Sequence, residues 1–180
     1  MTELRLSGSG GQGLILIGII LAEAAIFDNK LAIQSQSYGP EARGGASKAE
    51  VIIAEKPIHY PKVTNPNLVL AMTQEAANKY CTDLAAEGTL IVDTTFVRDI
   101  PSQIKNVLPL PITQLAKEKL GKPLFANIVA LGAIVALTKV VSVEAVTRAV
   151  LARVPKGTEA INQQALELGM SLINGVGSRP

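Results

Sequence analysis

Short β-prone runs alternate with helical stretches along the chain, and this alternation is what most limits its possible folds. The strand-like runs, rich in Leu, Ile and Val, are residues 4–7, 31–37, 49–54, 67–71 and 89–93. The helical stretches are residues 14–27, 74–86, 114–120 and 128–139. Such an order is typical of an α/β protein with a mainly parallel sheet. Since 180 residues that are 48% hydrophobic suffice for one core, we expect a single three-layer domain over residues 1–180.

Two regions depart from regular alternation. Residues 49–54 follow residues 31–37 without an intervening helix, so we expect this strand pair to break the parallel winding. Three prolines surround a short strand-like segment at residues 106–108. In the last third of the chain, Ser142 and Thr158 are suitable N-caps for the final two helices.

Charge, cysteine content and hydropathy exclude several classes of function. The net charge of +2 comes from mixed acids and bases, which argues against a nucleic-acid partner. The densest apolar stretches, residues 14–22 and 128–137, are too short to cross a bilayer, and the N-terminus shows no secretory signal. One cysteine (Cys81) and one histidine (His59) cannot supply a zinc or iron–sulfur site. We therefore expect a cytoplasmic protein with no membrane contact and no metal of its own.

The first motif that could bind a ligand is GSGGQG, which fits GxGxxG between a strand and a helix. Glycines permit a sharp turn and the close approach of an anion, and the free N–H groups at a helix start attract negative charge. The alternative is that the glycines only allow tight strand–helix packing. The candidate ligand-binding residues of this motif are Gly8, Gly10, Gly11, Gln12 and Gly13.

A dinucleotide-binding protein should also carry an acidic residue at the end of its second strand, where it holds the ribose hydroxyls. Residues 33–37 read IQSQS and contain no Asp or Glu. A stand-alone dinucleotide-binding oxidoreductase is therefore the second choice.

A second Gly-rich segment, QSYGPEARGG, follows the second strand and should lie at the same edge of the sheet as the first. Ligands of open α/β sheets bind in such a crevice, where Arg43 could contact a phosphate or carboxylate. The alternative is that an ion pair of Arg43 with Glu41 or with another subunit braces the loop. Its candidate residues are Tyr38, Gly39, Glu41, Arg43, Gly44 and Gly45.

The pairing of GSGGQG with QSYGPEARGGASKAEV closely resembles the gamma subunit of 2-oxoacid:ferredoxin oxidoreductases. The resemblance continues through Pro111, residues 114–121 and the segment NIVALG at residues 127–132, so it covers most of the chain. It implies a Rossmann-like fold and a pyruvate/ketoisovalerate oxidoreductase gamma-type domain. The length is most similar to a free-standing gamma subunit of the 2-oxoglutarate branch.

The resemblance implies an enzyme that converts a 2-oxoacid and coenzyme A (CoA) into an acyl-CoA and CO2, with electrons passing to ferredoxin. The resemblance implies that partner subunits hold thiamine diphosphate, Mg and the iron–sulfur clusters. These partners are an alpha and a beta subunit and, in complexes that have one, a ferredoxin-like delta subunit. Neither the thiamine-binding signature nor cluster ligands occur in this sequence, so no catalytic residue is expected on this chain. Whether the oxoacid is 2-oxoglutarate, pyruvate, a branched-chain oxoacid or indolepyruvate is left open.

The resemblance leaves two roles open for the Gly-rich segments, which could contact CoA or only brace the partner subunits. A pure assembly subunit is thus a third possibility beside the first two. We expect Cys81 to be a packing residue, and Asp93, Thr94 and Thr95 to form a turn or helix cap more readily than a ligand contact. The apolar helices exceed what one small core needs, which predicts a homodimer or hetero-oligomer.

Overall fold

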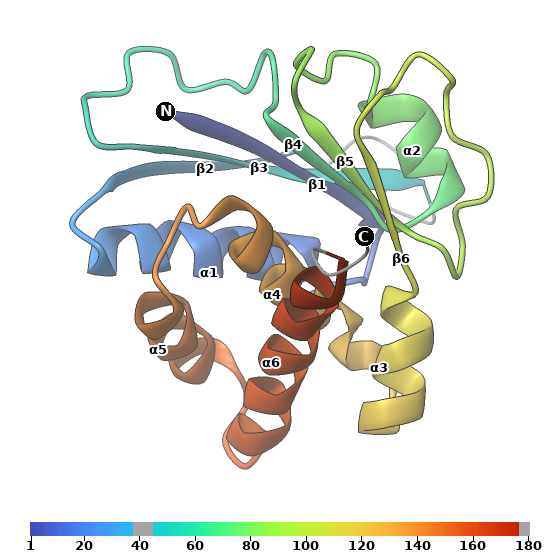
Figure 1. Cartoon of the computed structure of the whole chain (residues 1–180). Helices are drawn as coiled ribbons and strands as arrows, with labels where there is room; N and C mark the ends of the chain where they lie inside the picture. The colour runs from blue at the N-terminus through green and yellow to red at the C-terminus, as the bar shows by residue number, and fades with distance from the viewer. Residues whose placement is uncertain (38–44, 177–180) are drawn as a thin grey trace.

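The computed structural model describes residues 1–37 and 45–176, which form one six-stranded sheet and its helices (Figure 1). The strands are β1 (Thr2–Ser9), β2 (Leu31–Ser37), β3 (Ala46–Ala54), β4 (Leu68–Ala71), β5 (Thr89–Asp93) and β6 (Val107–Leu110). The helices are α1 (Leu14–Phe27), α2 (Gln74–Tyr80), α3 (Ile112–Leu120), the 3-10 turn η1 (Pro123–Phe125), α4 (Ala126–Thr138), α5 (Val143–Arg153) and α6 (Glu159–Val176).

The strand order is β2-β3-β1-β4-β5-β6. Strands β1, β4, β5 and β6 pair in parallel, whereas β3 pairs antiparallel with both β1 and β2. The predicted break in parallel winding between residues 31–37 and 49–54 is therefore confirmed. Its cause is the shortness of the connection between β2 and β3: residues 38–45 are fewer than the dozen or more that a parallel crossover needs.

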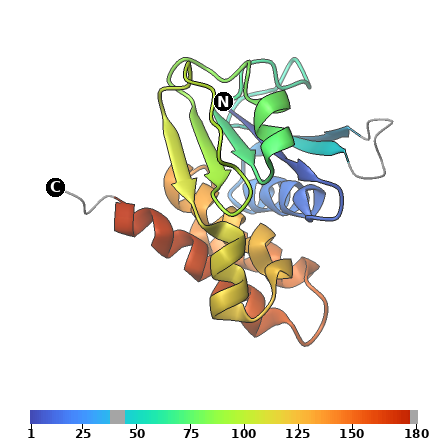
Figure 2. The same cartoon turned by 90° about the vertical axis from the view of Figure 1, so that its right-hand side faces the viewer.

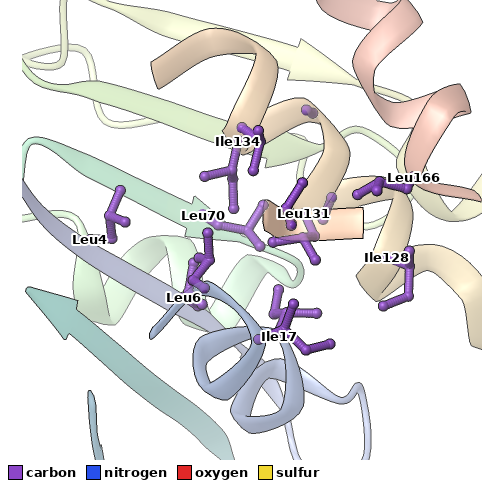
Figure 3. Packing of buried hydrophobic residues seen from close by; sticks show 14 of the residues in the cluster. Leu4, Leu6, Ile17, Leu70, Ile128, Leu131, Ile134 and Leu166 are labelled. Carbon is purple, nitrogen blue, oxygen red and sulfur yellow. The ribbon is translucent and has the colours of Figure 1, made fainter. Parts of the chain in front are cut away.

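The helices form two unequal layers around the sheet, as Figures 1 and 2 show. Helix α2 covers one face and the remaining helices pack on the other, so the predicted three-layer α/β fold is confirmed. Side chains alternate along β1: Leu4 and Leu6 enter the large core beneath α1 and α4, while Arg5 and Ser7 face the α2 side. Figure 3 shows Leu4 and Leu6 beside the residues of α1 and α4 that complete this core.

Helix α2 is shorter than predicted, because it ends at Tyr80 and not at residue 86. The carbonyl of Tyr80 accepts a hydrogen bond from Nη1 of Arg5 at 3.0 Å. The next N–H groups leave the helical pattern: Leu84 donates to the carbonyl of Cys81 and Ala85 to that of Pro66. Contacts with residues far away in the sequence thus end the helix six residues early.

Other bounds differ by only a few residues. The strand predicted at residues 106–108 spans Val107–Leu110 and forms the sheet edge, where the missing N–H of Pro109 is tolerated. Ser142 caps α5 as predicted, since its Oγ accepts a hydrogen bond from the N–H of Ala145 at 3.1 Å. None of the helices in the described part of the chain is long and apolar enough to span a membrane.

Candidate functional site

The GSGGQG motif forms a tight turn between β1 and α1, as predicted. Gly11 and Gly13 have φ angles of 87° and 75°, in the left-handed region where glycine is favoured. Gln12 holds the turn closed: its Oε1 accepts a hydrogen bond from the N–H of Ser9 at 2.8 Å. The side chain of Gln12 therefore supports the loop.

Helix α1 begins at this turn without a side-chain cap. Its first intrahelical bond runs from the N–H of Ile17 to the carbonyl of Gly13 at 3.2 Å. Within residues 1–37 and 45–176, the N–H groups of Leu14, Ile15 and Leu16 have no hydrogen-bond acceptor. Free N–H groups at the positive end of a helix dipole are suited to an anion.

The glycines of the turn differ in how closely other atoms pack against them. A Cβ on Gly8 would lie 2.2 Å from Oε1 of Gln12, and one on Gly13 would lie 2.2 Å from Nδ2 of Asn127. Around Gly10 and Gly11, in contrast, nothing lies within 4 Å of an added Cβ. Gly8 and Gly13 are thus required for tight packing, whereas Gly10 and Gly11 leave space that a ligand could occupy.

A cleft of about 350 Å³ opens beside the turn. Its walls come from the carboxyl ends of β1, β4 and β5, the start of α3 and the connection between α3 and α4. The lining residues are Gly11, Gln12, Gly13, Met72, Phe96, Thr113, Pro123, Leu124, Ala126 and Asn127. Open α/β sheets bind their ligands at this edge, and the volume lies within the range of ligand pockets.

Asn127 is the polar group that sequence analysis missed as a site residue. It is only 8% exposed and lines the cleft from the first turn of α4. Its Oδ1 accepts a hydrogen bond from the N–H of Ile128 at 2.9 Å, while its Nδ2 has no acceptor among the described residues. The signal in the sequence that could have identified Asn127 is its position as a polar residue just before the apolar run of residues 128–137.

Two exposed apolar side chains stand at the mouth of the cleft and were also missed. Phe96 is 48% exposed and Leu124 is 69% exposed. Nearby Asp93 is fully buried and plays the predicted structural part. Its carboxylate accepts hydrogen bonds from the N–H of Thr95 at 3.0 Å and from the N–H and Oγ1 of Thr113 at 3.1 and 2.5 Å. It therefore fixes the start of α3, which forms one wall.

The second Gly-rich segment is described only at its end. Tyr38, Gly39, Glu41, Arg43 and Gly44 lie outside the described residues. Gly45 is half-buried and directly precedes β3, whose first residue, Ala46, pairs with Ser9 of β1. The end of this segment thus lies beside the start of the GSGGQG turn.

Helix α2 holds this junction from the opposite face of the sheet. The hydroxyl of Tyr80 donates to the carbonyl of Ala46 at 2.9 Å, and Oε1 of Glu75 accepts from its N–H at 3.3 Å. Beneath them, buried Arg5 bonds Glu50 at 2.8 Å and Asp83 through two hydrogen bonds. The hydrogen bond from the Arg5 guanidinium lowers the pKa of the Asp83 carboxyl below its usual value. This network is structural and lies away from the cleft.

Cys81 is buried and donates a hydrogen bond from Sγ to the carbonyl of Ala77 at 2.6 Å. Burial raises the pKa of its thiol, which keeps it protonated and unreactive. The prediction that it is a packing residue is confirmed. In the part of the chain that the structure describes, no three His, Cys, Asp or Glu side chains form a group that could hold a metal ion.

The sheet order bears on the dinucleotide alternative. A dinucleotide fold places its second strand next to the first, so that the end of that strand reaches the ribose. Here antiparallel β3 lies between β1 and β2. The end of β2 is therefore two strands away from the GSGGQG turn, and the geometry does not favour this alternative.

Comparisons with known proteins agree with the geometry. Residues 3–172 match the family model for pyruvate ferredoxin/flavodoxin oxidoreductase. The chain is 48% identical to 2-oxoglutarate synthase subunit KorC of Methanocaldococcus jannaschii, over 93% of this chain and 91% of that protein. It is 46% identical to the protein of the same name from Methanothermobacter marburgensis, over 95% and 96%.

A solved structure gives the same result. The keto/oxoacid ferredoxin oxidoreductase gamma subunit of Geobacter sulfurreducens PCA superposes with a TM-score of 0.88 at 49% identity, over 97% of this chain and 99% of that one. The chain therefore belongs to the pyruvate ferredoxin/flavodoxin oxidoreductase family, and its predicted resemblance to a gamma subunit is confirmed.

Proposed function

We propose that this chain is the gamma subunit of a complex that oxidatively decarboxylates 2-oxoglutarate. The complex joins the acyl group to CoA, releases CO2 and passes two electrons to ferredoxin. Family membership supports the reaction class, and the names of the two relatives at 46% and 48% identity support 2-oxoglutarate as the oxoacid. The gamma-type domain spans residues 1–180.

The redox chemistry belongs to partner subunits in this proposal. Alpha and beta subunits hold thiamine diphosphate and Mg, and they or a ferredoxin-like delta subunit hold the clusters. The sequence supports this division because a chain with one cysteine cannot ligate an iron–sulfur cluster.

The observation that carries the role of this chain is the uncapped start of α1 at the edge of the cleft. Among the described residues, three N–H groups and Nδ2 of Asn127 have no acceptor, and the space around Gly10 and Gly11 is open. Together they offer donors and room to an anion. CoA brings a diphosphate and a 3′-phosphate to the enzyme. A cleft of about 350 Å³ would hold part of this molecule, so the rest lies against a partner subunit.

The role of the second Gly-rich segment is tested by Arg43→Ala in the complex reconstituted from all its subunits. Loss of a charged hydrogen bond to a phosphate removes about 1.5–3 kcal/mol, so the KM for CoA should rise about tenfold or more. The KM for 2-oxoglutarate should stay unchanged. The matched control is Arg148→Ala, because Arg148 lies on α5 and contacts the ring of Phe27, 4.0 Å from its centroid.

Two results would contradict this contact. Weaker subunit association in gel filtration, with a lower rate at saturating CoA and oxoacid, assigns Arg43 to bracing of the assembly. If the Arg43→Ala complex has the same kinetics and assembly as the Arg148→Ala control, Arg43 is not part of the site.

A further inference from the structure

Helix α1 is apolar on all sides, although the fold buries only part of it. Its sequence, LILIGIILAEAAIF, contains one charged residue, Glu23. Ile15, Ile19, Ala22 and Ile26 recur at helical spacing and therefore share one face. The first three are partly exposed and Ile26 is 60% exposed. A helix that is hydrophobic all round is normally buried all round.

The contacts of α1 show where this apolar stripe lies. Gly18 faces the sheet, because a Cβ there would lie 3.3 Å from Cβ of Ala49 and 3.7 Å from Cγ of Gln34. Glu23 and Phe27 face α5, where they contact Arg153 and Arg148. Helix α5 lies beneath α1, on the side away from the sheet (Figure 1). By helical periodicity, the stripe formed by Ile15, Ile19, Ala22 and Ile26 lies between these two faces.

The same side of the molecule carries the free edge of the sheet. Strand β2 is the outermost strand, and Gln34 at its centre packs on α1. Its seven residues, LAIQSQS, contain no charge, proline or glycine, and Leu31 is 47% exposed. The opposite edge, β6, is only four residues long and carries exposed Pro109. Short length and proline protect an edge from pairing, and β2 has neither protection.

We propose that the β2 edge and the α1 stripe together form a dimer interface with a second copy of this chain. A two-fold axis perpendicular to the sheet would pair β2 antiparallel with its copy. Because α1 packs along β2, the same axis brings the two α1 stripes together in the helix layer. The two elements have similar lengths, roughly 21 Å for α1 and 23 Å for β2. Each can therefore contact its counterpart in the second copy along its whole length.

Charge also favours a second copy over a charged partner. Glu23, the one charge in these two elements, is paired with Arg153 at the α5 side. A neutral surface meets its own copy without repulsion, whereas a charged partner would lose solvation and gain no ion pair. The inference is independent of the CoA contact proposed above.

Light scattering on the isolated full chain tests the interface. We expect twice the monomer mass of 18.9 kDa at micromolar concentration. Ile19→Lys places a charge in the stripe, and Gln36→Lys places one on an exposed position of the edge strand. Each should raise the dissociation constant of the dimer about tenfold or more, because it places an unpaired charge at a dry contact. Leu124→Lys, at the exposed mouth of the cleft, is the control and should remain dimeric.

Circular dichroism separates loss of folding from loss of pairing, and Gln36→Lys alters an exposed side chain that no core cluster includes. A monomeric native chain overturns the proposal, as does a dimer that both variants leave intact. A native monomer whose Ile19→Lys variant fails to join its partner subunits assigns the surface to one of them instead.

Discussion

At the scale of single residues, two glycines of one turn are predicted to differ in what they tolerate. Gly13→Ala forces a Cβ to within 2.2 Å of Nδ2 of Asn127 at a φ of 75°, whereas Gly10 has open space and no left-handed φ. We expect Gly13→Ala to lower the free energy of unfolding by about 1–3 kcal/mol and Gly10→Ala to leave it nearly unchanged. Urea unfolding of both variants checks this, and equal midpoints would contradict the geometry.

The Arg5 network predicts a pH dependence of stability. The hydrogen bond from Arg5 lowers the folded-state pKa of Asp83, so the ionised carboxylate stabilises the fold above its unfolded pKa and the gain is lost as the pH falls through the folded value. Since the Asp83 side chain is 43% exposed and Glu50 also pairs with Arg5, the effect is small. We expect Asp83→Asn to cost about 0.5–1 kcal/mol at neutral pH and less in acid.

Urea titrations at neutral pH and near pH 3 measure this difference. Glu87→Gln, which changes an exposed carboxylate, serves as the control and should give the same midpoint as the native chain at both pH values. A cost for Asp83→Asn that grows in acid would have the wrong sign for this ion pair.

Residue-level prediction succeeded where the chemistry is local and failed where it depends on distant contacts. The positions of Gly11 and Gly13 in the turn follow from the strand–glycine–helix order alone. Asn127 could not be assigned to the site in this way, because it meets Gly13 only once α4 packs beside α1. Phe96 and Leu124 likewise reach the cleft through two different connections.

At the scale of elements, bounds were predictable where the signals lie within the segment. The patterns of residues 14–27, 31–37 and 89–93 predict the bounds of α1, β2 and β5 as the structure has them. The prediction for α2 was wrong because Arg5, on a strand far away in the sequence, takes the carbonyl of Tyr80. The helix propensity of residues 74–86 cannot predict that contact, because Arg5 lies outside the segment.

The packing of α4 against α6 gives the prediction at this scale. The two helices touch backbone to backbone, since a Cβ on Gly169 would lie 1.9 Å from the carbonyl oxygen of Val129. We expect Gly169→Ala to destabilise the chain by about 1–3 kcal/mol, because the helices must separate to admit the methyl group.

Gly175→Ala is the matched control in the same helix, where nothing lies within 4 Å of an added Cβ. There the substitution should be neutral or slightly stabilising, since alanine favours a helix over glycine by about 1 kcal/mol. Thermal unfolding of the two variants decides, and a Gly169→Ala variant as stable as Gly175→Ala would show that the crossing is looser than described.

At the scale of the whole molecule, the sequence predicts the edge of the sheet that carries the site but not its full shape. Both Gly-rich segments follow strands, which places them at the carboxyl edge. The wall formed by η1 and the start of α4 comes from residues 123–127, far along the chain from the Gly-rich segments, so its position depends on the helix packing. The insertion of β3 beside β1 is what separates this fold from a dinucleotide-binding one, and it became certain only from the strand order.

The division of labour in the complex gives the last prediction. In the proposed complex this chain contributes to CoA binding, and partner subunits hold the redox groups, because one buried cysteine cannot ligate an iron–sulfur cluster. We expect the isolated chain to be colourless and to reduce no ferredoxin in the presence of 2-oxoglutarate and CoA. Addition of the partner subunits should give both the brown colour of iron–sulfur clusters and the activity.

Absorption spectra measure the colour and ferredoxin reduction measures the activity, with the partner subunits without the gamma chain as the control. A yellow or brown isolated chain would mean that this subunit holds a redox group of its own, and full activity of the partners without it would remove it from the reaction.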